Sequence, residues 1–433
     1  MAQHTQPSAL VRAMGRWTLA ALVVNSIVGS GIFALPAVIG RLTGPAAPWA
    51  WVVGAAGNGV VMLSFAEVAS RFRGAGGAYL YARAALPRWL AIQVGWLAAL
   101  TRLSAAAAAA NLFVVHLAEF WRPVELPWAR LGVLSILIGG LAYVNHRGVR
   151  GGSRVSNGFT IAKLAPLLVF LAAGAVYLMR GGGALAAQAP GTGEWLKASL
   201  LIAFAYGGYD GAMLAMGEAE RPRRDAPFAL MAAMLFLAAL YTAVQLLVDG
   251  ILGGTTSERP VVEAARIALG PAGGMLLAAG ALVSIVGYLA ANFINAPRLA
   301  FALAEQGDAP GIFARVHPRY RTPYVSLWLF AFSVFLLALY GSFEWNALLS
   351  AVTRLFVYGC TCATLLVLRR RDPQGARLRL PGGAVCAWLG MALCALLIAQ
   401  MGRGELAVLA GVAAVGLLHW LAVRSGGTKV PAE

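Results

Sequence analysis

Apolar stretches long enough to cross a lipid bilayer recur along the whole chain. Because crossing the hydrocarbon core takes about 20 residues, the pattern predicts twelve membrane spans separated by short polar segments. They lie near 17–40, 46–71, 89–120, 128–146, 157–179, 195–218, 227–252, 273–304, 324–342, 345–368, 384–402 and 405–423. The apolar runs are continuous, whereas the strands of a transmembrane barrel alternate apolar and polar positions. We therefore expect an all-α polytopic membrane protein.

Glycines interrupt the first and the sixth predicted spans near mid-membrane. The first contains NSIVGSGIFALP at residues 25–36, and the sixth contains FAYGGYDG at residues 204–211. Glycine weakens a helix interior by about 1 kcal/mol relative to alanine. Unwound backbone is tolerated in a membrane only where it is buried in protein or lines a cavity. Small residues also serve close helix packing, but the second interruption favours two discontinuous helices.

The offset of five spans between the interruptions predicts an inverted repeat. An odd offset reverses the orientation of equivalent spans, and paired broken helices in inverted repeats are typical of secondary transporters. The expected organisation is a single membrane domain over 1–433, with a first five-helix repeat over 17–179, an inverted second repeat over 195–368 and two additional helices over 384–423. The intervening loops are too short to form a soluble core, so binding is expected among the helices.

Charge gives the predicted bundle an orientation. The 433 residues are 60% hydrophobic and 12% charged, and the formal net charge is +17. In the loops, 22 lysines and arginines lie on the side of the N-terminus and 8 lie on the opposite side. Because these residues accumulate on the cytoplasmic side of membranes, both termini are expected in the cytoplasm. Arginine greatly outnumbers lysine, and alanine and glycine are abundant, which is typical of a GC-rich bacterial genome and indicates a bacterial inner (plasma) membrane. The positive charge suits contact with anionic lipid and not nucleic-acid binding.

Five segments of the chain, taken in order, resemble the amino acid–polyamine–organocation (APC) superfamily of transporters. VVNSIVGSGIFALPA is similar to the first span of that family. Similar matches follow in the second span and its loop, the sixth span and its exit, the end of span eight, and span ten. These later matches cover residues 63–86, 204–227, 295–327 and 354–371.

The resemblance implies a LeuT-like fold of two inverted five-helix repeats, with helices 1 and 6 discontinuous. It also implies alternating-access transport of amino acids or related amines. By this resemblance, backbone in the first break would hold the amino and carboxylate groups of the substrate, and the sixth-span break would complete the pocket and supply an aromatic cap. The residues so implied are Ser26, Gly29, Ser30, Gly31 and Ile32 in the first span, and Phe204, Ala205, Tyr206, Gly207 and Tyr209 in the sixth.

Lys163 and Asp210 are the expected coupling or gating residues. Several members of the superfamily carry a lysine in the matching fifth span, facing the first break where sodium-coupled relatives place a cation. An ammonium at this position would bridge broken-helix carbonyls without sodium and support proton coupling or exchange; the alternative is a lysine that reaches toward the cytoplasmic interface. Asp210 follows the sixth-span glycines, and intramembrane carboxylates are functional candidates. It would contact a substrate amine, accept a proton, or form a structural pair.

Other polar residues within the spans have more ordinary interpretations. Glu67 and Glu218 lie near span ends and are expected to pair with nearby arginines. Arg354 is expected to be a structural anchor, and Arg102 to pair with a carboxylate that the sequence does not identify. His116 is expected to pack or to cap a helix, and no metal, cofactor or catalytic residue is expected.

The leading prediction is sodium-independent amino acid transport, by proton coupling or by substrate exchange. A polyamine or arginine/agmatine-type antiporter is the alternative, and a channel or a membrane-embedded enzyme is a remote one. No Walker-type phosphate loop is visible, and the cysteines all lie in spans ten and eleven, away from any disulfide framework. The expected partners are a small amino acid or amine, protons and membrane lipid, and both a monomer and a homodimer are compatible with the sequence.

Overall fold

The computed structural model describes residues 15–72, 77–148, 153–183, 194–210, 221–255, 257–373, 375–399 and 402–425. Within these ranges the regular secondary structure is entirely helical. The helices of the first half are α1 (Arg16–Ile27), α2 (Gly31–Thr43), α3 (Ala47–Ala69), α4 (Gly77–Ala85), α5 (Arg88–Leu117), α6 (Pro127–His146) and α7 (Ser153–Met179). Those of the second half are α8 (Trp195–Ala205), α10 (Pro222–Leu252), α11 (Pro260–Leu269), α12 (Pro271–Glu305), α13 (Tyr324–Tyr340), α14 (Phe343–Arg371), α15 (Gly383–Ile398) and α16 (Arg403–Ser425).

Short 3₁₀ turns and local sequence signals mark the helix ends. The turns are η1 (Gly44–Ala46), η2 (Arg122–Glu125) and η4 (Gly311–Ala314). Proline lies within the first two positions of α6, α10, α11 and α12, where its missing N–H costs no intrahelical bond. α10 ends at Leu252 and is followed by Gly253, whose φ of 59° is left-handed. Ser342 caps α14 by accepting a hydrogen bond from the Trp345 amide.

The described chain contains seven stretches long and apolar enough to cross a membrane, and four shorter apolar helices. The α2–α3 region, α5, α6, α7, α10, α12 and α14 supply the long stretches. Apolar side chains such as Ile136, Leu235 and Phe332 are exposed on the outside of the bundle, as expected of a surface covered by lipid. The prediction of a polytopic helical membrane protein is confirmed.

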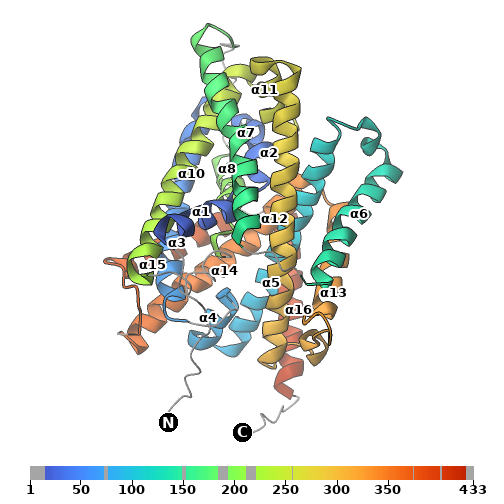
Figure 1. The fold of residues 1–433 in the computed structure, drawn as a ribbon. Coiled ribbons are helices and arrows are strands. Elements are labelled where there is room, and N and C mark those ends of the chain that lie inside the picture. The colour runs from blue at the N-terminus through green and yellow to red at the C-terminus, as the bar shows by residue number, and fades with distance from the viewer. Residues whose placement is uncertain are drawn as a thin grey trace.

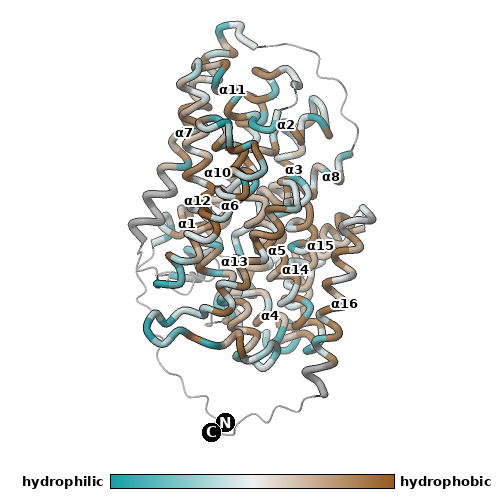
Figure 2. The backbone as a smooth tube through the Cα atoms, turned by 90° about the vertical axis from the view of Figure 1, so that its right-hand side faces the viewer, coloured by the Kyte–Doolittle hydropathy of each residue, from teal (hydrophilic) through white to brown (hydrophobic). Residues whose placement is uncertain are grey.

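α5 lies at the centre of the bundle and packs against α14, α12, α13 and α4. Figure 1 shows the long helices side by side, with α11 near one end of the bundle and α4 near the other. We call these the α11 end and the α4 end. Figure 2 shows hydrophilic segments gathered toward these two ends and hydrophobic ones along the body of the bundle between them. The buried alanines at 105–110 give α5 a flat surface for close packing.

Candidate functional site

The first break lies between α1 and α2. α1 ends at Ile27, and Val28 leaves the helical conformation with ψ of 99°. α2 begins at Gly31, continues through Pro36, and has no acidic residue in its first turn. The carbonyl end of one helix and the N–H end of another therefore lie close together in the interior. Their partial charges are negative and positive, respectively.

Lys163 of α7 binds the carbonyl end of this break. Its Nζ donates hydrogen bonds to the carbonyl oxygens of Asn25 and Val28, both at 2.9 Å. The residue is only 1% exposed, so the ammonium does not reach out of the bundle. Its charge opposes the negative end of the α1 dipole and strengthens both hydrogen bonds. The structure thus brings Lys163 to the break that the sequence motif marks.

The second break follows α8. α8 ends at Ala205, residues 206–208 are not helical, and Tyr209 and Asp210 are helical again. Gly208 has a φ of 110°, a conformation that residues with a side chain rarely adopt. A Cβ at this position would lie 2.5 Å from the carbonyl oxygen of Ser26. The backbone conformation and the close approach of α1 therefore both require glycine at position 208.

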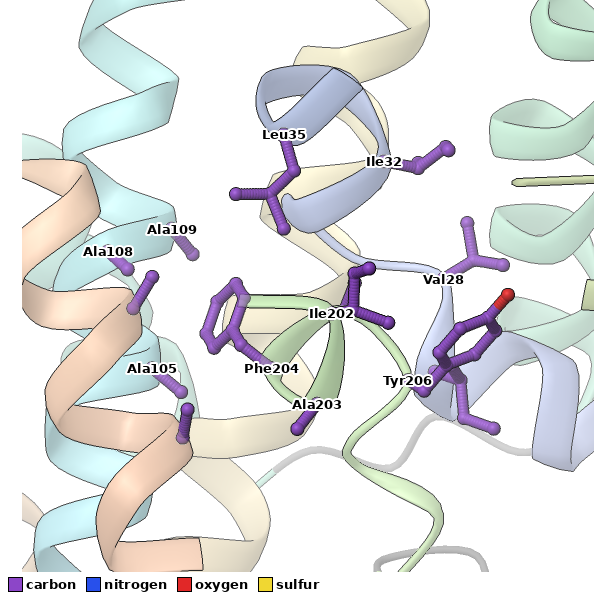
Figure 3. Packing of buried hydrophobic residues seen from close by; sticks show 14 of the residues in the cluster. Val28, Ile32, Leu35, Ala105, Ala108, Ala109, Ile202, Ala203, Phe204 and Tyr206 are labelled. Carbon is purple, nitrogen blue, oxygen red and sulfur yellow. The ribbon is translucent and has the colours of Figure 1, made fainter. Parts of the chain in front are cut away.

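The two breaks contact each other at two places, one at the end of α1 and one at the start of α2. Gly208 faces Ser26 at the end of α1, and Gly31 at the start of α2 faces Ala205, where a Cβ on the glycine would lie 3.1 Å from the alanine Cα. Gly29 lies against the ring of Tyr288 from α12, and a Cβ at this glycine would lie 3.3 Å from the nearest ring carbon. Figure 3 shows the start of α2 and the end of α8 in this arrangement. Small residues are needed because backbone meets backbone here.

Among the remaining first-break residues, Ser30 and Ile32 are buried. The Ser26 hydroxyl donates to the carbonyl oxygen of Val23, 2.8 Å away, within its own helix. The Ser26 hydroxyl is therefore engaged within its own helix, and the break presents backbone groups at the end of α1 and at the start of α2. This agrees with a site in which the main chain binds the ligand.

Arg354 of α14 binds the carbonyl end of the second break. Its Nη1 donates to the carbonyl oxygen of Phe204 at 3.2 Å, and the residue is 6% exposed. A Cβ at Gly207 would overlap the guanidinium, so the arginine occupies the space that a side chain at 207 would need. The sequence suggested an anchor at Arg354, but it did not indicate which group the arginine holds.

Arg102 of α5 pairs with Asp210, the carboxylate that follows the second break. Arg102 Nη2 lies 2.7 Å from Asp210 Oδ2, and the two side chains are 22% and 25% exposed. The pair links the central helix to the residues directly after the break. The sequence left the partner of Arg102 open because the two residues are 108 positions apart.

Two of the three aromatic candidates at the second break, Tyr206 and Tyr209, pack against residues of neighbouring helices. The Tyr206 hydroxyl donates to the carbonyl oxygen of Trp51 at 3.2 Å, and its ring stacks on Tyr241 with centroids 5.1 Å apart. Tyr209 packs against Phe65 and Tyr358, with centroid distances of 5.8 and 5.1 Å. Both tyrosine rings are thereby fixed among neighbouring helices.

Phe204 is the third aromatic candidate, and its ring faces α5. Figure 3 shows the ring directed toward Ala105, Ala108 and Ala109, all buried. Its other side approaches Phe343 of α14, with ring centroids 6.1 Å apart. Of the three aromatics, Phe204 is therefore the one that lies between the break and a small-residue surface.

Gln245 of α10 binds α2, the helix that follows the first break, and the sequence reasoning did not identify it. Its amide donates to the carbonyl oxygen of Pro36 at 2.9 Å and to Asp249 Oδ1 at 2.8 Å, and its Oε1 accepts from the Trp51 indole at 2.7 Å. A glutamine within the apolar predicted span 227–252 is the signal that would have found it, because a polar side chain there needs hydrogen-bond partners.

Other sequence expectations have mixed outcomes. Glu67 forms the predicted ion pair, with Arg369 Nη2 at 2.6 Å, so that prediction is confirmed. Glu218 lies outside the described residues. His116 is buried, and its Nδ1 lies 3.0 Å from the carbonyl oxygen of Leu112, which agrees with a packing and capping role. In the part of the chain that the structure describes, no three His, Cys, Asp or Glu residues are grouped to hold a metal ion.

A helical membrane bundle with two facing helix breaks, each bound by a buried cation from another helix, defines the class of membrane transport proteins with discontinuous helices. Comparison with known proteins names the family. The sequence model of the amino acid permease family matches residues 14–415. The chain belongs to this family.

Similar proteins cover most of the chain. The branched-chain amino acid permease BcaP of Bacillus subtilis is 27% identical over 91% of this chain and 89% of its own length. The methylthioribose transporter of the same organism is 24% identical over the same shares. The serine/threonine exchanger SteT, also of Bacillus subtilis, is 26% identical over 75% of this chain and 76% of its own length.

Proposed function

We propose that this permease is a secondary active transporter that moves amino acids across the bacterial inner membrane by alternating access, without sodium. Its fold is a LeuT-like arrangement of inverted five-helix repeats within about twelve spans, and both termini face the cytoplasm. The α4 end of the bundle is accordingly the cytoplasmic end. The observation that carries this proposal is the first break, where Lys163 donates to the Asn25 and Val28 carbonyls.

The first break supplies both halves of a site for an amino acid. N–H groups at the start of α2 bind the substrate carboxylate, because a helix N-terminus attracts anions. Carbonyl groups near the end of α1 that Lys163 does not use bind the substrate ammonium. The backbone around Ser26, Gly29, Ser30, Gly31 and Ile32 therefore recognises the part that all amino acids share, and Ala205 and Gly207 complete the wall.

The surroundings of the breaks support a neutral substrate side chain. The Phe204 ring and the alanine surface of α5 are apolar. Asp210, the carboxylate that a second amine would use, is already paired with Arg102 at 2.7 Å. This favours neutral amino acids over the alternative of polyamine or arginine/agmatine exchange. Phe204 caps the substrate, while Tyr206 and Tyr209 hold the break in shape.

Lys163 couples transport to the state of the first break. The protonated amine binds the α1 carbonyls more strongly than the neutral amine, because its charge adds to the hydrogen bonds. Loss of the proton weakens the contact and frees the α1 half to move. Such a lysine supports proton symport as well as sodium-independent exchange.

Counterflow in proteoliposomes tests the proposal. Vesicles in sodium-free buffer are preloaded with neutral, basic or acidic amino acids, agmatine or putrescine, and labelled uptake is followed with and without a pH gradient. We expect uptake of neutral amino acids. Uptake that needs internal substrate identifies an exchanger, and uptake into empty vesicles driven by inward protons identifies a symporter. No uptake of any amino acid or amine would refute the function.

The variant Lys163→Ala then tests the coupling residue. We expect at least about a tenfold loss of uptake, since a charged hydrogen-bond donor is worth about 1.5–3 kcal/mol. Leu167→Ala is the matched control, because Leu167 is fully buried on the same helix and one turn away. Equal losses in the two variants would assign the effect to packing and refute the coupling role.

A further inference from the structure

Both breaks are bound by a cation from a distant helix, and the two cations occupy equivalent places in the proposed repeats. Lys163 lies ten residues after the first residue of α7, and Arg354 lies eleven residues after the first residue of α14. α7 and α14 are the fifth helices of the two proposed repeats. In each case the cation donates to carbonyl oxygens at the end of the first half of that repeat's broken helix. The equivalence rests on the repeat organisation proposed above.

The two cations differ in chemistry. Arginine keeps its proton in proteins, whereas a buried lysine can release it. An arginine at the second break therefore stays charged throughout a transport cycle. The negative end of the α8 dipole and the Phe204 carbonyl therefore have a permanently charged partner. The equivalent carbonyls of α1 have a partner that can lose its charge.

The space around Arg354 is also arranged for a permanent contact. The guanidinium fills the position of a side chain at Gly207. Gly208 has a left-handed φ, whereas Gly207 does not. Position 207 therefore requires glycine because of the arginine and not because of its backbone conformation. The Phe204 ring also lies 6.0 Å from the guanidinium carbon, within reach of a cation–π contact.

The charged and titratable groups facing Arg354 come from three elements. They are Tyr209 and Asp210 after the second break, Tyr288 of α12 and Tyr358 of α14. Asp210 is paired with Arg102, and the ion pairs found among the described residues do not include Arg354. The Phe204 carbonyl is thus the hydrogen-bond acceptor that the structure identifies for this buried guanidinium. A buried cation is costly without such partners.

We propose that Arg354 is the fixed counterpart of Lys163, a positioning residue that holds the α8 end of the second break while the first break releases its own cation. Arg354 sets the orientation of the Phe204 carbonyl and of the Phe204 ring that caps the substrate. The internal repeat then carries one switchable cation and one permanent cation at equivalent places.

A double-mutant cycle between positions 207 and 354 tests the contact. In Gly207→Ala the new methyl group would overlap the Arg354 guanidinium, so we expect a loss of thermal stability in detergent. Arg354→Gln shortens the side chain and removes its charge. Adding Arg354→Gln to Gly207→Ala should recover part of the stability lost by the glycine variant, since contacting residues are not additive. Additive effects, or a Gly207→Ala variant as stable as the wild type, would overturn the proposal.

The variant Arg354→Lys tests whether a permanent charge is needed. We expect transport at neutral pH with a several-fold higher KM and little change in maximal rate. As the pH is raised above neutral, uptake by the variant should decline at a lower pH than uptake by the wild type. The cation at the second break would then be a lysine, which can lose its proton. Arg298→Lys, an exposed arginine on α12, is the control and should leave both properties unchanged. A wild-type pH profile in Arg354→Lys would overturn the proposal.

These experiments separate the proposal from the proposed function. The stability cycle needs no substrate, so it reports on the Gly207–Arg354 contact even if the wild-type protein transports no amino acid. Conversely, amino acid uptake with additive stability effects would support the function and refute the role of Arg354.

Discussion

Carboxylates that join helices at the α4 end of the bundle are buried, whereas those at the α11 end are partly exposed. Glu67 and Asp308 have fully buried side chains. Glu119 and Glu344 are 12% and 35% exposed. Removing one partner of a buried pair costs about 3–5 kcal/mol, while an exposed pair contributes about 0–1 kcal/mol. The α4 end is therefore held together more tightly.

Asp308 is the centre of the first cluster at the α4 end. Its carboxylate accepts hydrogen bonds from the Tyr79 hydroxyl at 2.6 Å, from Arg83 at 2.9 Å and from Arg88 at 2.7 Å. These donors come from α4 and the start of α5, and Asp308 follows α12. A single buried carboxylate thus joins three helices, with each of its oxygens occupied.

Glu67 is the centre of the second cluster at that end. Arg369 of α14 binds both carboxylate oxygens, at 2.7 and 2.6 Å, and the Leu380 amide donates to one of them at 3.0 Å. The two-point geometry fixes the end of α3 against the end of α14 and the segment that follows it.

At the α11 end, Glu344 connects α2 and α8 to α14. Lys197 of α8 lies 3.1 Å from one carboxylate oxygen, and Arg41 of α2 lies 3.8 Å from the other. These exposed contacts reach the helices that follow the first break and precede the second. The ion pairs that join helices at the α11 end are therefore weaker than those at the α4 end, and we expect the α11 end to open with little loss of stability.

The largest effect is expected from Asp308→Ala. Removing the carboxylate leaves two arginines and a tyrosine around an empty acceptor, and we expect a loss of about 3–5 kcal/mol. Thermal unfolding in detergent measures it. Glu305→Ala, at the exposed end of α12 nearby, is the control. A loss no greater than that of the control would remove the difference between the two ends.

Glu67→Gln should have the next largest effect. The amide cannot accept from Arg369 at both atoms, and the loss of charge-assisted bonds should cost about 2–3 kcal/mol. The same thermal assay applies, and Arg369→Lys should show a similar loss, because a lysine cannot bind both oxygens in parallel. Wild-type stability in both variants would argue against a tight α4 end.

Tyr79→Phe should have a smaller effect, with a pH dependence. It removes one hydrogen bond to a carboxylate, for which we expect about 1.5–2 kcal/mol. Burial, together with the bond to Asp308, raises the pKa of Tyr79 above its ordinary value near 10. The contribution is therefore complete below about pH 10 and declines at higher pH, where the unfolded chain releases the proton first.

Stability measured from pH 7 to 11 checks this prediction. The difference between the wild type and Tyr79→Phe should be constant up to about pH 10 and should shrink above it. Tyr143→Phe, at an exposed position of α6, should show no such difference. A gap between wild type and Tyr79→Phe that widens with pH would contradict the cluster described here.

The smallest effect on stability is expected from Glu344→Gln. We expect less than about 1 kcal/mol, because the pairs are exposed. Since about 1 kcal/mol changes an equilibrium roughly fivefold, the variant should still alter the KM for substrate added at the α11 side. High salt should mimic the variant in the wild-type protein by screening the pairs. A stability loss as large as that of Asp308→Ala would show that the two ends are equally tight.

The apolar pattern along the chain is sufficient to predict which segments form membrane helices, and the glycine motifs of two of them indicated where those helices break. Continuous apolar runs require helices in a membrane, because each backbone group must find a partner within its own segment. Glycines near mid-membrane in the first and sixth predicted spans indicated the two breaks, although α3 stays helical through Gly54, Gly57 and Gly59. The breaks at 28–30 and 206–208 follow from these local signals, and Pro36, which the first motif also contains, lies inside α2.

The groups that meet at those breaks depend on how the helices pack in three dimensions. Arg102 and Asp210 are 108 positions apart, and Arg354 and Phe204 are 150 apart, so no local pattern relates them. The three aromatics of the second break are alike in sequence, yet Tyr206 and Tyr209 pack among neighbouring helices and Phe204 faces α5. Side-chain direction and the pairing of buried charges depend on where distant helices lie, and the packing of the whole bundle sets those positions.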